Sequence, residues 1–114
     1  MTSIEKVSIT PQIKKLCACS FYICKKLKKV DISPDSNLQI IESDAFCSTA
    51  IESLYIPRFV SNIGDLAFNK CFYLSIIEID ENSEMKKFNK ATLCPFKVTI
   101  IMASCKLKDI FINK

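Results

Sequence analysis

The sequence predicts an α/β repeat solenoid, in which short, similar coils stack along one axis. A shift of 47 residues superimposes the apolar positions of the chain on one another without a gap, for example Ile4 on Ile51. Each block of 47 residues divides into units of about 23–24 residues, because apolar pairs such as Val7 and Val30 recur at that spacing. One such unit cannot bury its apolar side alone, so the units must stack.

Each unit begins with a predicted β-strand. Apolar and polar residues alternate there, which is typical of a strand with one buried face, at residues 7–9, 30–32, 54–56 and 77–79. Because these strands recur once per unit, we expect them to form a parallel β-sheet along one face of the solenoid. Pro34 and Pro57 follow two of the strands and are expected to end them.

The rest of each unit predicts a return leg made of turns and a short α-helical or 3₁₀-helical segment. In residues 61–71, Ala67 and Phe68 are expected to point into the solenoid. Cysteines recur 47 residues apart, which favours small apolar side chains stacked inside the coils over a chemical role; these pairs are Cys24 with Cys71 and Cys47 with Cys94.

The length of 114 residues allows one domain, residues 1–114. We expect four units and part of a fifth, at residues 4–29, 30–53, 54–76, 77–100 and 101–114. The repeat pattern begins by Ile4 and is still present at Ile110, whereas a terminal unit normally needs a polar outer face. Uncapped ends of this kind predict one of three alternatives: a piece of a longer array, a degraded small paralogue, or a protein that covers its ends by self-association.

One motif repeats with little change over residues 38–85, L-x-x-I-x-I-P-x-x-V-x-x-I-G-x-x-A-F-x-x-C. It is carried by Ile-Glu-Ser-Asp-Ala-Phe at 41–46, by the run from Ile51 to Cys71 and by residues 74–79. With this motif the chain resembles the BspA-like (treponemal-type) leucine-rich repeat family, and its period falls within the roughly 20–29 residues of leucine-rich repeats. The match is looser over residues 4–32, and from residue 86 onward only the apolar positions persist.

The resemblance implies a short leucine-rich-repeat array whose surface binds other proteins, as in surface antigens and adhesins, without catalysis. The predicted function is therefore a non-enzymatic protein–protein interaction module with host or cell-surface proteins as partners. An intracellular leucine-rich-repeat scaffold or adaptor is the alternative. It is favoured by a start that does not read as a secretory signal and by seven cysteines, an odd number that favours reduced thiols. For the localisation, the resemblance thus favours the cell surface, whereas the sequence favours the cytoplasm.

The composition excludes several kinds of chemistry. One glycine and no histidine leave no material for a Gly-rich phosphate loop, a histidine acid–base pair or a histidine-ligated metal. The cysteines of residues 17–24 lack the second ligand pair that structural zinc requires. Asp31 and Glu78 are the best candidates for a catalytic carboxylate pair. We interpret their placement as coincidence, because the middle positions of the strands face solvent. We therefore predict no catalytic residue, no metal and no cofactor, and we expect Cys105 to be the exposed thiol.

The net charge of +4 is unevenly distributed along the chain. Residues 1–29 carry a net charge of +6, and the remaining residues carry −2. This distribution favours an acidic partner or an anionic membrane surface at the basic end, but the charge of the whole chain is too small to indicate nucleic acid. No apolar stretch approaches the roughly 18–20 residues of a membrane-spanning helix, so no transmembrane segment is predicted.

The middle positions of the strands are the first candidate binding site. They are expected to form a row across the outer face of the sheet, made of Ser8, Asp31, Tyr55, Glu78 and Met102. Tyr55 is predicted to be a rigid aromatic anchor between acidic neighbours. The alternative is that Tyr55 only covers the neighbouring strand.

A basic rim is the second candidate. It lies where the return leg re-enters a strand and consists of Lys25, Lys26, Lys28 and Lys29 around a buried Leu27. These lysines either dock an acidic protein or lipid headgroups or form a solvated edge. At the rim of the first candidate site, the outer face of the sheet, Phe59, Phe72 and Tyr73 are expected to add a patch.

Overall fold

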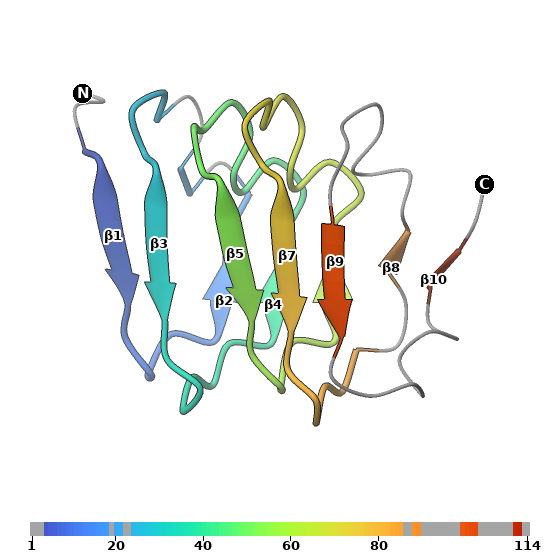
Figure 1. The fold of residues 1–114 in the computed structure, drawn as a ribbon. Helices are drawn as coiled ribbons and strands as arrows, with labels where there is room; N and C mark the ends of the chain where they lie inside the picture. Colours follow the sequence, from blue (N-terminus) through green and yellow to red (C-terminus); the bar gives the residue numbers. More distant parts are fainter. Residues whose placement is uncertain are drawn as a thin grey trace.

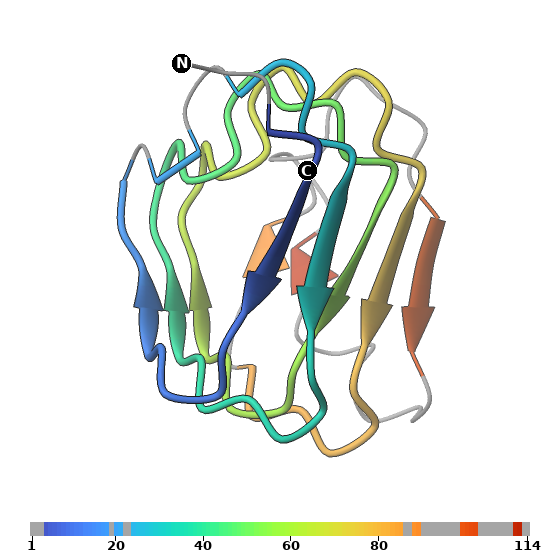
Figure 2. The same cartoon turned by 90° about the vertical axis from the view of Figure 1, so that its left-hand side faces the viewer.

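The computed structural model describes the backbone of residues 4–18, 20–21, 24–85, 88–89, 99–102 and 111–112, and the side chains of those up to residue 85. The chain winds into stacked coils (Figures 1 and 2). We refer to residues 4–29, 30–53 and 54–76 as the first, second and third coils. Each of these contributes one longer strand, one short strand and a leg of turns. The predicted stacking of repeat units with parallel strands is confirmed.

The longer strands lie side by side along one face, which we call the first face (Figure 1). They are β1 (Lys6–Ile9), β3 (Lys29–Ile32), β5 (Ser53–Ile56), β7 (Ile76–Ile79) and β9 (Thr99–Met102). β1 pairs with β3, β5 with β7 and β7 with β9, and all pairs are parallel. β3 and β5 are neighbours, but no ladder of hydrogen bonds joins them, so two separate sheets make up this face.

The short strands form a second parallel sheet behind the first face (Figure 2). They are β2 (Lys15–Leu16), β4 (Ile40–Ile41) and β6 (Asn62–Ile63), in that order. β8 (Phe88–Asn89) also pairs in parallel, with β10 (Phe111–Ile112).

The turns that lead from the first face to the second alternate between a short and a long form, which explains the period of 47 residues. After β5 the chain turns within four residues, and Val60 N donates to Pro57 O at 3.2 Å. After β3 the connection is two residues longer, and Leu38 N donates to the buried Ser36 Oγ at 3.1 Å. The turns after β1 and β7 repeat the short and the long form respectively, 47 residues away.

After its longer strand and its short strand, each coil returns to the first face through a third leg, which consists of turns. The prediction of short helices in this leg is wrong, because the described residues contain no helix. In residues 42–50 the backbone N–H groups bond alternately within the leg and to a neighbouring coil. Ala45 N donates to Glu42 O at 3.2 Å. The next donor, Phe46 N, reaches Ala67 O of the third coil at 3.0 Å. In a helix, every successive N–H group donates to a carbonyl of the same segment. Here alternate N–H groups donate to a neighbouring coil instead, so a helix cannot form.

Aromatic rings fill the space between the legs and run through the coils as one stack. Phe46 lies between Phe21 of the first coil and Phe68 of the third, at centroid distances of 5.4 and 5.9 Å. Phe46 and Ala67 are fully buried and Phe68 is almost so, which confirms that residues 67 and 68 point inward. Burial of these large rings, together with the aliphatic side chains of the core, stabilises the stacked coils.

The described cysteines occupy two environments. Cys47 and Cys71 are buried and Cys24 is partly buried, which confirms their position inside the coils. Cys71 Sγ donates to Phe46 O at 3.0 Å, and burial raises the pKa of this thiol. Cys17 is exposed, so it is an accessible thiol that the sequence analysis missed. Two further cysteines for which predictions were made lie outside the described residues, Cys94 and Cys105.

Gly64 begins the leg of the third coil where two backbones come together. Its N–H donates to Ile41 O of the second coil at 2.7 Å. A Cβ atom at this position would collide with both the backbone and the side chain of Ser43. The motif therefore has a glycine here because of close approach between coils.

Candidate binding surface

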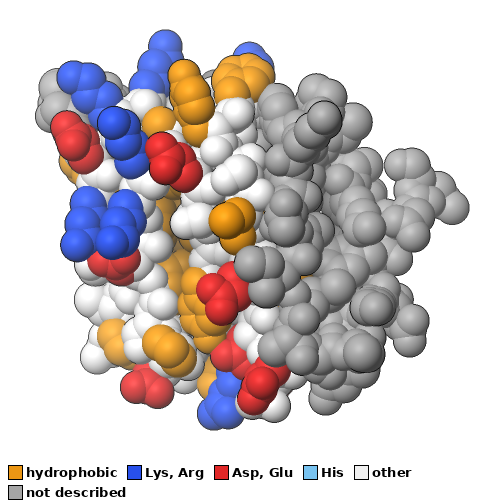
Figure 3. All heavy atoms as spheres, in the orientation of Figure 1, with side chains coloured by type: hydrophobic (Ala, Val, Ile, Leu, Met, Phe, Trp, Pro, Cys, Tyr) orange, Lys and Arg blue, Asp and Glu red, His pale blue; other side chains and the backbone are white. Residues whose placement is uncertain are grey.

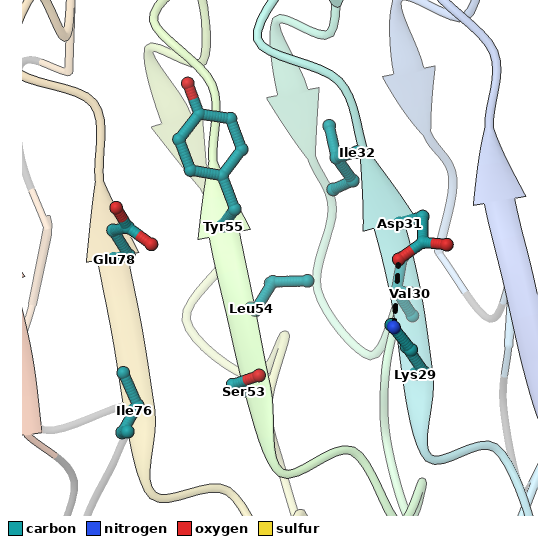
Figure 4. Close-up of a pocket in the computed structure, with 9 residues that line it drawn as sticks. All are labelled: Lys29, Val30, Asp31, Ile32, Ser53, Leu54, Tyr55, Ile76 and Glu78. Carbon is teal, nitrogen blue, oxygen red and sulfur yellow. Dashed lines mark ion pairs between the residues drawn. The ribbon is translucent and has the colours of Figure 1, made fainter.

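A groove runs along the first face between β3 and β5, where no ladder joins the strands (Figure 4). We call it the sheet groove, and its volume is about 440 Å³. Residues of β3, β5 and β7 line it, namely Lys29, Val30, Asp31, Ile32, Ser53, Leu54, Tyr55, Ile76 and Glu78.

The break between β3 and β5 occurs where the repeat unit is one residue longer. Val7 and Val30 are 23 residues apart and pair directly, as do Leu54 and Ile77. Between them, Val30 and Leu54 are 24 residues apart, and their strands are not joined. One additional residue in the unit thus coincides with the one interrupted junction between neighbouring longer strands that the structure describes.

The sheet groove has an apolar floor between charged sides. Ile32 and Leu54 lie in the space between β3 and β5, and Glu78 directs its carboxylate towards β5 (Figure 4). The space-filling view shows apolar side chains along this hollow with charged groups on either side (Figure 3). Among the described residues Glu78 forms no ion pair. The groove therefore combines apolar contact area with an acidic group that is available to a partner.

Asp31, by contrast, is compensated by its own neighbours. Its two carboxylate oxygens pair with Lys6 Nζ at 3.3 Å and with Lys29 Nζ at 4.0 Å. All three side chains are well exposed, so these pairs contribute little to stability. The pair with Lys6 joins Asp31 to β1, and the pair with Lys29 lies within β3.

Tyr55 is oriented by a residue that the sequence analysis did not identify. Its hydroxyl donates to Asp80 Oδ2 at 2.5 Å, and Asp80 Oδ1 accepts from Asn82 N at 2.8 Å. Burial, followed by the bond to Asp80, raises the pKa of Tyr55 well above its usual range. The same bond lowers the pKa of Asp80. Asp80 directly follows β7, beside the strand that carries Tyr55, and this adjacency is the signal by which the sequence would have identified it.

The structure brings four residues of the predicted row onto the first face and corrects the fifth. These four residues form two directly paired positions, Ser8 beside Asp31 and Tyr55 beside Glu78. Ile101 lies beside Glu78, whereas Met102 pairs with Ile79, so the prediction of Met102 is wrong by one position. The reason is that β7 and β9 pair across 23 residues instead of the expected 24.

The predicted basic rim separates into two parts. Lys25, Lys26 and Lys28 line a second hollow, of about 370 Å³, together with Ala50, Glu52 and Tyr73. We call this the basic hollow. Lys29 belongs to β3 and lies at the sheet groove instead. Leu27 is fully buried beneath the lysines, as predicted.

The three aromatic residues expected at the rim of the sheet face do not form one patch. Phe72 and Tyr73 precede β7 and are 65 % and 67 % exposed. Phe59 follows β5, and because the strands are parallel it lies at the opposite end of the first face. There the guanidinium of Arg58 is 4.8 Å from the centroid of its ring. Of the three, Tyr73 lines the basic hollow together with the lysines.

Two further features are absent from the described part of the chain. No group of three or more cysteine, aspartate or glutamate side chains is placed there to hold a metal ion. None of the described segments is a helix long and apolar enough to cross a membrane.

Comparison with known proteins gives two matches. The model of the BspA type leucine rich repeat region, which comprises six copies of the repeat, matches residues 1–114. The crystal structure of a leucine rich cell surface protein from Faecalibacterium prausnitzii A2-165 is similar, with 31 % sequence identity and a TM-score of 0.66. The similarity covers 73 % of this chain and 21 % of that one, so the chain spans about one fifth of its length. Comparison with curated proteins gave no match.

Proposed function

Because the chain belongs to the BspA-type leucine-rich repeat family, we propose that it is a non-enzymatic protein–protein interaction module that binds its partner along the sheet groove. Members of this family are generally interaction modules without catalysis. The similar crystal structure is of a cell surface protein, and on that basis the proposal extends to recognition at the cell surface, as by a surface antigen or adhesin.

The observation that carries the proposal is the interrupted junction between β3 and β5. It gives an otherwise flat face a concave site with apolar floor residues, and concave sites of this kind bury more of a partner than flat ones do. Tyr55 is held in one orientation by Asp80, so binding costs less side-chain entropy there. Glu78 offers a carboxylate to a basic or polar group of the partner.

Site-specific photo-crosslinking tests this proposal. A crosslinking amino acid is placed at Ser53 or at Glu78, both exposed at the groove, and as a matched control at Asn62, which is exposed on the second face. Intact cells supply the candidate partners. We expect one protein to be captured from positions 53 and 78 and not from position 62. Equal capture from both faces, or capture from neither, would contradict binding at the sheet groove.

Labelling of intact source cells tests the cell-surface part of the proposal separately. A membrane-impermeant amine reagent is expected to modify this chain while cytosolic markers stay unmodified. Modification only after lysis would instead support the intracellular scaffold.

A further inference from the structure

The basic hollow lies at the corner where the third leg of each coil re-enters the first face. The three coils are joined there by backbone hydrogen bonds, since Ala50 N donates to Leu27 O and Ser75 N to Glu52 O, both at 2.9 Å. The two residues that precede the buried Leu27, Ile51 and Leu74 are Lys25-Lys26 in the first coil, Thr49-Ala50 in the second and Phe72-Tyr73 in the third.

The size of the side chains explains why this corner is hollow. In the second coil Thr49 is buried and Ala50 is small, whereas the coils on both sides carry long or aromatic side chains at these positions. Two strand spacings, roughly 10 Å, separate the first coil from the third. The hollow is therefore wide enough for one extended polypeptide segment.

The two walls of the hollow differ in chemistry. Lys25, Lys26 and Lys28 form a cationic wall, and among the described residues none of the three takes part in an ion pair. The opposite wall is Tyr73, which is 67 % exposed. Basic and hydrophobic side chains lie close together along the upper edge of the first face in Figure 3.

We propose that the basic hollow binds an acidic peptide segment of the protein partner, with carboxylates on the lysines and an aromatic side chain against Tyr73. This inference rests on the proposed function, since it names the chemistry of a partner segment. It adds a second contact site to the sheet groove, at the same end of the first face as Lys29.

The distribution of charge directs an acidic segment to this corner. Residues 30–85 contain ten acidic and two basic residues, a net charge of −8, whereas residues 1–29 carry +6. An acidic segment is thus repelled by most of the described surface and attracted to the first coil, and such complementarity mainly sets orientation and association rate.

Glu52 favours a peptide over a phosphate polymer or a lipid surface. It is one of the residues that line the hollow, together with the lysines and Tyr73. A carboxylate there repels phosphate groups, but it accepts hydrogen bonds from the backbone N–H groups of an extended peptide. A hollow is also less accessible to a flat membrane than protruding lysines would be.

Binding of a synthetic glutamate–tyrosine copolymer, followed by fluorescence anisotropy, tests the inference. Polyglutamate, a single-stranded oligonucleotide and phosphatidylserine vesicles serve as comparison probes. We expect the copolymer to bind about tenfold more tightly than polyglutamate, and Tyr73→Ala to remove this difference. Tighter binding of the oligonucleotide or of the vesicles would overturn the proposal.

A matched pair of charge reversals separates the site from net charge. Lys25→Glu with Lys26→Glu changes the hollow, and Lys14→Glu with Lys70→Glu makes the same change of charge at exposed positions elsewhere. We expect the first pair to weaken binding of the copolymer by about tenfold or more and the second pair by much less. Equal loss from both pairs would overturn the proposal.

A third variant blocks the hollow without changing charge. Ala50→Tyr fills the space between the walls and is expected to abolish the preference for the copolymer, while circular dichroism checks the fold. Failure of these experiments, with crosslinking at Ser53 and Glu78 intact, contradicts the basic hollow and leaves the sheet groove. Failure of the crosslinking, with selective copolymer binding intact, contradicts the groove.

Discussion

Two junctions of the first face differ although their strands have similar sequences. Between β5 and β7 the ladder is continuous, Tyr55 lies beside Glu78, and the paired positions are 23 residues apart. Between β3 and β5 the positions are 24 residues apart, the ladder is interrupted, and the sheet groove opens. A difference of one residue in unit length therefore accompanies the change from a flat sheet to a concave site.

The interior does not show the same difference. The phenylalanine stack runs across the open junction, with similar centroid distances of 5.4 and 5.9 Å on the two sides of Phe46. The legs also remain bonded across it, as in the bond from Gly64 N to Ile41 O. The coils can thus separate at the first face because packing and the other two legs hold them together.

The largest expected effect comes from removing the ring that crosses the open junction. Phe46→Ala should lower the free energy of unfolding by about 3–5 kcal/mol, because it creates a cavity between Phe21 and Phe68. Urea denaturation measures the loss. Phe21→Ala, at the end of the stack and only partly buried, should cost clearly less, and an equal cost would contradict this account.

Gly64→Ala should destabilise the protein by about 1–3 kcal/mol, because the new methyl group overpacks the contact with Ser43. The exposed neighbour supplies a control, since Asp65→Ala is expected to change stability little. Thermal unfolding of the two variants compares them. If Gly64→Ala were as stable as the control, the close approach between the second and third coils at Gly64 and Ser43 would not hold the junction together.

Hydrogen exchange tests the comparison without mutation. The amides of β5 that face β3 should exchange about tenfold or more faster than those that face β7, because no ladder protects them. Exchange followed by NMR resolves the individual amides of residues 53–56. Uniform protection across β5 would show that the junction is closed in solution.

Tyr55→Phe should lower stability by about 0.5–1.5 kcal/mol through loss of the bond to Asp80. The bond lowers the pKa of Asp80, so its contribution is present above the ordinary aspartate value of 3.8 and is lost as the pH falls below it. It raises the pKa of Tyr55, so the contribution is also lost as the pH rises beyond the ordinary tyrosine value of 10.0. The variant should approach the wild type in stability at both extremes. A constant difference at all pH values would exclude this bond as the cause.

The smallest effect is expected at the junction between β1 and β3. Asp31→Asn removes both exposed ion pairs yet should change the free energy of unfolding by less than about 1 kcal/mol. Added salt should reduce even this difference in a denaturation experiment. A loss comparable to that of Phe46→Ala would mean that surface charge, rather than packing, joins the first two coils.

Much of the candidate site was predictable from the sequence. Ser8, Asp31, Tyr55 and Glu78 were placed on one face by the alternation of strand residues, and the register agrees. Met102 was misplaced because a period of 47 residues does not reveal a change of one residue between β7 and β9. The division of the lysines between two hollows also escaped prediction, since Lys28 and Lys29 are adjacent in sequence but point to different surfaces.

By itself the sequence determined the repeat, the parallel stacking and the buried positions, because periodic apolar residues can be buried in few other ways. Tertiary structure alone decided that the third legs are turns, since alternate N–H groups such as that of Phe46 bond to the neighbouring coil. It also decided the sheet groove and the orientation of Tyr55 by Asp80. These features depend on how one coil meets the next, and contacts between coils are not encoded in the pattern of any single repeat.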